Sequence, residues 1–143
     1  MPITAKVINY NWRQKVNNTK VGCKYSLKCQ LPLVGKSRYC FNHWLDRTYV
    51  TKTTRFSVTV EELVALWDKQ KGKCAITSCV LVPGKNVALD HIISTNKNGS
   101  HTVANLRFIH YSINQLKHSM SDIELKSIIN EIGPALSDWA KGE

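Results

Sequence analysis

The chain has 143 residues, a net charge of +10 and five cysteines. This length suffices for one ordinary hydrophobic core, or for a small core and a metal-stabilised module. No apolar run reaches membrane-spanning length and no signal-peptide pattern opens the chain, so composition argues against a membrane protein and we expect a soluble, cytoplasmic one.

The positive charge lies in the first part of the chain. Residues 1–56 contain eleven Lys or Arg and one acidic residue, a net +10, whereas residues 57–143 contain nine of each and are neutral. We therefore expect a basic module at 1–56 that binds a polyanion, with double-stranded DNA as the partner, and a second domain at 57–143. The alternative, a surface that is basic only for solubility, would not require this segregation.

Four candidate metal ligands follow a basic arm predicted at residues 1–22, in the pattern Cys23-x₅-Cys29-x₁₀-Cys40-x₂-His43. Three thiolates and one imidazole complete a tetrahedral structural Zn²⁺ site, which would supply much of the folding energy of so polar a segment. The alternative is a set of unrelated thiols in a loop. The expected task of the module is to present basic side chains to DNA phosphates: Lys24, Lys28, Lys36 and Arg38.

The next segments predict an α+β domain. A helix is expected from about residue 57 to Gly72, because Thr59 and Glu62 form a capping box and glycine commonly ends helices. A strand is expected over 87–93, which contains a run of apolar residues.

The dipeptide Asn98-Gly99 predicts a hairpin turn, after which 101–103 would return as a second strand. A helix is predicted over 104–117 from an apolar stripe at helical spacing. Ser121 and Glu124 form a second capping box and begin a further helix, which Gly133-Pro134 would interrupt. Its buried side chains are expected to be Ile123, Ile128, Ile129 and Ile132.

Asp90-His91, Asn105 and Asn114 form the most informative motif. Asp90 offers an anionic oxygen and Asn114 an amide oxygen to a hard cation, while His91 is a neutral base near pH 7. These groups can hydrolyse a phosphodiester with one Mg²⁺ or Mn²⁺ ion. Successive strand residues point to opposite faces, so Asp90 and His91 can serve one phosphate only if the strand ends or twists there.

The helix predicted over 104–117 would place four polar residues on one face, where they could hold metal, phosphate and DNA. The alternative is an ordinary solvated helix face, and for His110 a structural hydrogen bond is an equal alternative. The four residues are Arg107, His110, Asn114 and Lys117.

The order and spacing of this set, with Asn98-Gly99-Ser100-His101 between its halves and Asn114-x-x-Lys117 at its end, resemble the phage-type HNH endonucleases over roughly 57–132. The resemblance implies a small ββα-metal core, a hairpin packed on a helix with a divalent ion between them, followed by further helices. The cysteine–histidine pattern likewise resembles zinc knuckles found at the start of many phage HNH proteins.

By resemblance, His91 is the general base, Asp90 and Asn114 are the ligands of the catalytic ion, and Asn105 is a structural residue that ties the helix start to the loop carrying the base. The implied activity is DNA hydrolysis that leaves 5′-phosphate and 3′-hydroxyl ends, in a homing-type or related phage enzyme acting in the bacterial cytoplasm. Two alternatives remain, a non-catalytic zinc-containing DNA-binding protein on an HNH scaffold and an RNA-directed nuclease. The sequence leaves open whether the protein is a monomer or a homodimer.

The chain departs from part of this family at a second cysteine pair. Many relatives carry two Cys-x-x-Cys pairs that bind zinc near the active site. Here Cys74 and Cys79 form one widened pair, and His110 and Ile113 stand in the places of the other. Because two sulfurs do not close a tetrahedral site, we expect no zinc there and interpret both as small core thiols.

Overall fold

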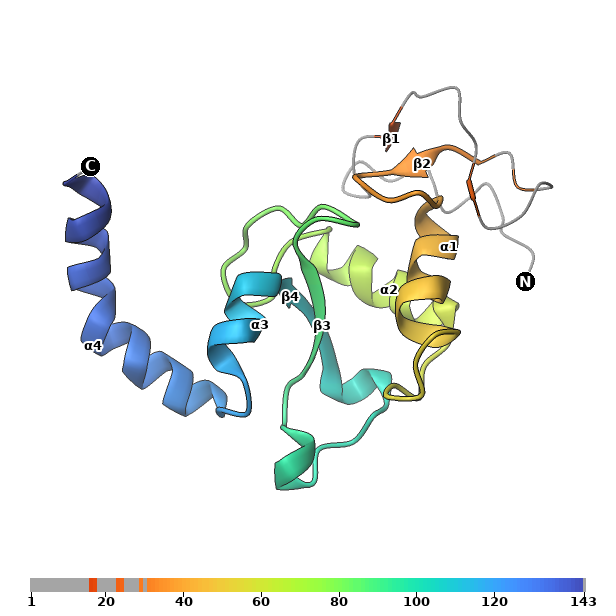
Figure 1. Cartoon of the computed structure of the whole chain (residues 1–143). Helices are drawn as coiled ribbons and strands as arrows, with labels where there is room; N and C mark the ends of the chain where they lie inside the picture. Colours follow the sequence, from red (N-terminus) through yellow and green to blue (C-terminus); the bar gives the residue numbers. More distant parts are fainter. Residues whose placement is uncertain (1–15, 18–22, 25–28, 30, 143) are drawn as a thin grey trace.

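The computed structural model describes residues 16–17, 23–24, 29 and 31–142 (Figure 1). The fold is mixed α+β, as predicted. In chain order the elements are β1 (Val16–Asn17), β2 (Leu33–Val34), α1 (Phe41–Leu45), the π-helical turn η2 (Asp46–Val50), α2 (Val60–Gln70), β3 (Val87–His91), the 3₁₀ turns η3 (Thr95–Lys97) and η4 (Val103–Asn105), β4 (Leu106–His110), α3 (Tyr111–Lys117) and α4 (Asp122–Lys141). Across these residues no helix combines the length and apolar content that a bilayer crossing requires.

Helix α2 begins and ends as predicted. The Thr59 side chain accepts a hydrogen bond from the Glu62 backbone N–H (3.2 Å), and the Glu62 carboxylate accepts one from the Thr59 N–H (2.9 Å). Lys71 and Gly72 follow with φ of 55° and 66°, the left-handed backbone that terminates a helix. The face that contains Trp67 is buried.

Strands β3 and β4 form an antiparallel hairpin in which Asp90 lies opposite Arg107 and His91 lies opposite Leu106. Helix α3 follows β4 without a linker and packs against both strands. The prediction of a helix over 104–117 is therefore wrong for its first half. The prediction of a strand at 101–103 is also wrong, because that segment leads into a 3₁₀ turn.

The connection between the strands is a long loop rather than a tight turn. Asn98 adopts the left-handed backbone (φ 64°) where η3 ends, so the Asn98-Gly99 pair terminates a 3₁₀ turn instead of joining two strands. The loop folds back on itself, since the Gly99 N–H donates to the Ser94 carbonyl (3.0 Å). The hairpin signal thus identified a chain reversal but assigned it to the wrong turn type.

One hydrophobic core joins α1, η2, α2 and the hairpin. Its centre is aromatic: Trp44 and Phe108 each pack edge-on against Trp67, with ring centroids 5.6 and 5.1 Å apart. Tyr49 in turn meets both Trp44 and Phe108 edge-on. The division of the chain at residue 56 stays a prediction, and side chains from both sides of it share this core.

Helix α4 projects away from the rest of the molecule (Figure 1). The Ser121–Glu124 capping box is confirmed, but Gly133-Pro134 does not end the helix, which runs through to Lys141. Figure 1 shows a bend along α4, as expected where proline removes one backbone hydrogen bond and crowds the preceding turn. The predicted burial is wrong for Ile123, Ile129 and Ile132, which are exposed, whereas Ile128 is partly buried and Leu125 is fully buried.

Candidate functional site

Cys23, Cys29, Cys40 and His43 come together in space as the sequence predicts, and their ligand atoms all lie within 4.8 Å of one another. Cys40 is the N-cap of α1 and His43 lies one turn later, so the short helix presents both to the same point. The His43 Nδ1 lies 3.2 Å from the Cys23 sulfur and 3.4 Å from the Cys40 sulfur. Adjacent ligands around tetrahedral zinc are separated by roughly 3.4–3.8 Å, so the four ligand atoms are close enough together to hold such an ion after small adjustments.

The cluster is chemically suited to a metal and poorly suited to free thiolates. Burial raises the pKa values of Cys29 and Cys40, and burial lowers the pKa of His43, which keeps its imidazole neutral at pH 7. A bound cation would reverse the preference of the thiols, because it stabilises the deprotonated form. These four residues could therefore hold a structural metal such as zinc.

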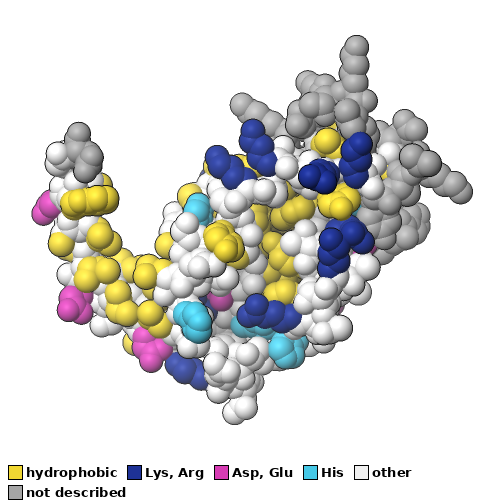
Figure 2. Space-filling view, in the orientation of Figure 1, with side chains coloured by type: hydrophobic (Ala, Val, Ile, Leu, Met, Phe, Trp, Pro, Cys, Tyr) yellow, Lys and Arg dark blue, Asp and Glu magenta, His cyan; other side chains and the backbone are white. Residues whose placement is uncertain are grey.

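Exposed basic side chains lie around this cluster, and Figure 2 shows Lys and Arg gathered over the part of the molecule that contains β2 and α1. Lys24, Lys36 and Arg38 are exposed. Lys28, also predicted to contact DNA, lies outside the described residues.

A polar cleft of about 460 Å³ opens at the other end of the molecule, between the end of β3, the following loop and α3. It receives Asp90 and His91 from the end of β3 and Asn114 from α3. The two adjacent strand residues reach one cleft at the point where the strand ends. The lining residues are Arg55, Asp90, His91, Ser94, Thr95, Asn96, Asn114, Gln115, Lys117, His118 and Ser119.

The buried Asp90 carboxylate is held by two cations. Its Oδ1 accepts from the Lys117 Nζ and its Oδ2 from the Arg107 Nε, both at 3.0 Å. Lys117 also donates to the His91 carbonyl, and Arg107 forms a bidentate pair with Asp122 at 2.7 and 2.9 Å. The formal charges of these four ionic groups sum to zero, so the site is internally neutralised.

The role of Arg107 and Lys117 in contacting DNA stays a prediction, and in the structure both side chains pair with carboxylates of the protein. Lys117 has 1 % of its side chain exposed and Arg107 12 %, and their charges are committed to Asp90 and Asp122. A buried ammonium cannot reach a phosphate without leaving its partner. The predicted polar helix face does not exist, since Arg107 and His110 are strand residues.

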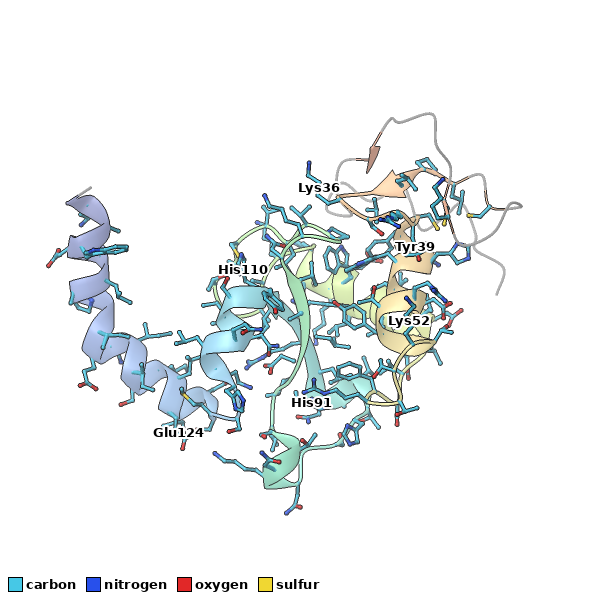
Figure 3. All side chains as sticks on the ribbon, in the orientation of Figure 1. Lys36, Tyr39, Lys52, His91, His110 and Glu124 are labelled. Carbon is cyan, nitrogen blue, oxygen red and sulfur yellow. The ribbon has the colours of Figure 1, made fainter. Side chains whose placement is uncertain are left out.

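His91 lies at the end of β3, and His110 lies at the opposite end of the hairpin (Figure 3). The His91 ring stacks on Phe56 (centroids 5.3 Å apart), and its Nε2 lies 3.1 Å from the Nδ1 of His101. Burial lowers the pKa of His91, as do the charges of Arg55, His101 and Lys117, while Asp90 opposes them. A neutral imidazole oriented by a second ring is a competent general base.

Asn105 holds the loop between the strands. Its Oδ1 accepts from the Ile93 N–H (2.9 Å), while its Nδ2 donates to the carbonyls of Ile93 (3.0 Å) and Ser100 (2.8 Å). The side chain thus ties both arms of the loop to the start of β4, where the sequence predicted the start of a helix. Gly99 is required beside it, because a Cβ there would overlap the Ile93 carbonyl oxygen.

His110 and the second cysteine pair lie outside the cleft. His110 caps α3, its Nδ1 accepting from the Ser112 N–H (3.1 Å), which is the structural alternative considered for it. Cys74 is buried as predicted, and its sulfur accepts backbone hydrogen bonds from Thr77 and His110. Cys79 is exposed, so its assignment as a core thiol is wrong.

Sequence reasoning missed Arg55, His101 and Asp122. His101 stood between the halves of the motif, but nothing in the sequence indicated its contact with His91. Arg55 is far from the motif along the chain, which hides its place in the same cleft. Asp122 carried a signal only as an acidic residue in a first helical turn. Comparisons of the chain with family models, with curated proteins and with solved structures find no match.

Proposed function

We propose that the chain is an HNH-type endonuclease that hydrolyses DNA with one divalent cation, Mg²⁺ or Mn²⁺, and that its Cys₃His cluster holds structural Zn²⁺. The observation that carries the proposal is that Asp90, His91 and Asn114 line one cleft. Asp90 and His91 come from the end of β3, and Asn114 comes from α3, the helix that follows β4. This arrangement supports the proposal, because the sequence resemblance implies a site on a hairpin and a helix.

In this proposal His91 removes a proton from the water that attacks phosphorus. The lowered pKa of His91 keeps the ring neutral at pH 7, and the His101 contact and Phe56 stacking fix its orientation. Arg55 is exposed at the cleft and can pair with a neighbouring phosphate. The cation, held by Asp90 and Asn114, would neutralise charge on the phosphate and on the leaving 3′ oxygen.

The ionic network around Asp90 sets a condition on the cation. A carboxylate has about four lone-pair sites, so Asp90 can accept two hydrogen bonds and still offer an oxygen to a metal. Two nearby cationic side chains nevertheless reduce its attraction for a second positive ion. We therefore expect the cation to bind weakly to the free protein and more tightly once a DNA phosphate contributes negative charge and oxygen ligands.

Cleavage of supercoiled plasmid tests the proposal. The zinc-loaded full-length protein should convert the plasmid to open-circular or linear DNA with Mg²⁺, and excess EDTA should stop the conversion. His91→Ala should cleave at least ~10²-fold more slowly, with DNA affinity within a few-fold of wild type. His110→Asn is the matched control, because asparagine retains a helix cap outside the cleft.

Equal cleavage by wild type and His91→Ala would contradict the assignment. DNA binding without metal-dependent cleavage would favour the non-catalytic alternative. Faster cleavage of single-stranded RNA than of DNA would favour the RNA-directed one.

A further inference from the structure

Helix α4 exposes an apolar face that nothing in the described chain covers. Figure 2 shows hydrophobic side chains along the inner side of the bent helix and acidic ones on its outer side. The exposed fractions on this face are large for such residues: Ile129 39 %, Ile132 39 %, Leu136 54 % and Trp139 70 %. Helix α3 also exposes two apolar side chains, Tyr111 and Leu116.

The apolar positions of α4 follow a seven-residue repeat. Their spacing alternates between four and three, which keeps them on one stripe that a second helix can cover. The members of the stripe are Leu125, Ile129, Ile132, Leu136 and Trp139. Small residues flank it at Gly133, Ala135 and Ala140, which allows another backbone to approach closely, and the acidic Glu131 and Asp138 lie away from it.

We propose that this stripe is a homodimer interface, in which α4 packs antiparallel against α4 of a second copy of the chain. A large apolar side chain has roughly 200 Å² of accessible surface. The exposed fractions of the four exposed stripe residues add up to about two such side chains, so each copy exposes on the order of 400 Å² of apolar surface on the stripe. With Tyr111 and Leu116 added, two copies would bury about 1,200 Å², the lower end of the range of specific interfaces. The apolar patch on a single copy would be half that size, about 600 Å², which is the upper limit for the largest exposed apolar patch of a typical monomeric protein.

The charge distribution favours a second copy over DNA and favours the antiparallel arrangement. Helix α4 carries four acidic and two basic residues, so it has a net −2 and leaves +12 on the rest of the chain. A net negative helix does not attract a polyanion. Parallel pairing would bring two strongly basic bodies together, whereas antiparallel pairing keeps them at opposite ends of a helix of 20 residues, roughly 30 Å long.

The antiparallel pair has a natural register. Centring it at Pro134 places Ile132 opposite Leu136 of the second copy and Leu136 opposite its Ile132, and it also pairs Ile129 with Trp139. These two reciprocal contacts give a test that distinguishes the proposed pairing from any other use of the face.

Sedimentation equilibrium of the zinc-loaded full-length protein should show a concentration-dependent rise from the mass of one chain to the mass of two. Ile132→Lys and Leu136→Glu should each weaken dimerisation by at least about 100-fold, because each places an unpaired charge in an apolar seam. Mixing the two variants should restore a dimer, since the ammonium introduced in one copy then faces the carboxylate introduced in the other, while the second contact stays apolar. Ile123→Glu, exposed on the same helix but off the stripe, should dimerise like wild type.

Both substituted positions are exposed, so circular dichroism should show unchanged helix content in every variant. A wild-type protein that remains a monomer at all concentrations would overturn the proposal, whether another partner or the chain's own N-terminal arm covers the stripe. Singly charged variants that still dimerise, or a mixture that does not recover, would overturn the antiparallel register. None of these results depends on nuclease activity.

Discussion

The two buried polar centres of this protein are built on opposite principles. The Cys₃His cluster gathers four groups that share a preference for a metal, and burial raises the pKa values of Cys29 and Cys40. The Asp90 centre gathers opposite charges that compensate one another, with Lys117 and Arg107 on separate oxygens of the carboxylate.

This difference indicates which of the two centres can form without a bound metal ion. A set of like ligands has no favourable arrangement without the ion, so its order should depend on metal. A neutralised ionic network is complete in the folded chain, so its order should depend on its buried members. The first centre should therefore fail on removal of the ion, and the second on removal of a side chain.

The largest expected effect is the loss of zinc. Zinc binding in small modules is worth about 10–16 kcal/mol, so Cys40→Ser should abolish stoichiometric zinc and expose residues 31–45 to hydrogen exchange. Cys79→Ser is the control, because Cys79 is an exposed thiol outside the cluster. Zinc analysis and exchange mass spectrometry measure both results. Stoichiometric zinc in Cys40→Ser would show that the cluster does not depend on this thiolate.

Lys117→Met should be the most damaging single change at the second centre. It leaves the buried Asp90 carboxylate with one cation instead of two, at an expected cost of about 3–5 kcal/mol in the free energy of unfolding. Asp90→Asn combined with Lys117→Met should recover part of this loss. Urea unfolding provides the measurement, with the exposed Lys69→Met as control. Equal free energies of unfolding for Lys117→Met and Lys69→Met would show that the Lys117–Asp90 pair does not stabilise the fold.

Asn105→Ala should cost about 2 kcal/mol, since it removes three hydrogen bonds that hold the loop after β3. Asn130→Ala, on the exposed surface of α4, should change the free energy of unfolding by less than about 0.5 kcal/mol. Urea unfolding at pH 7 compares the two. A matching loss in both variants would mean that the loop does not depend on this side chain.

Asp122→Asn should give the smallest effect, below about 1 kcal/mol, because the carboxylate is partly exposed. The hydrogen bonds from Arg107 hold the Asp122 pKa below its usual range. Its contribution is therefore present above the unfolded pKa of about 3.9 and is lost as pH falls through the lower folded value. Unfolding experiments at pH 7 and in strong acid should show a difference between wild type and variant that disappears in acid. If the difference in free energy of unfolding persists unchanged in acid, it does not arise from the ionised Asp122 carboxylate.

The sequence predicted most reliably where a local signal determines the structure. The capping boxes at Thr59 and Ser121 gave correct helix starts, and the ligand spacing correctly grouped the cysteines with His43. The segment 104–117 failed because its apolar residues fit a helical period, although 106–110 is a strand with core contacts on both faces. Periodicity cannot separate a short doubly buried strand from a helix.

The candidate site shows the same limit. The Asp90–His91–Asn114 grouping followed from the motif, whereas the partners of these residues did not. Lys117 is three residues beyond Asn114, yet its burial against Asp90 depends on how α3 packs on the hairpin. The exposure of Ile129 and Leu136 was also unpredictable, because an amphipathic pattern specifies a buried face without saying which molecule buries it.

Helix α1 has two faces with separate tasks, since His43 belongs to the metal cluster while Trp44 belongs to the aromatic core. The Trp44 indole lies 5.6 Å from that of Trp67, well inside the folded body. Any disturbance of the metal cluster reaches these rings through a single turn of helix. If the cluster binds zinc as proposed, tryptophan emission should change when the ion is added or removed, and binding could be followed without a label.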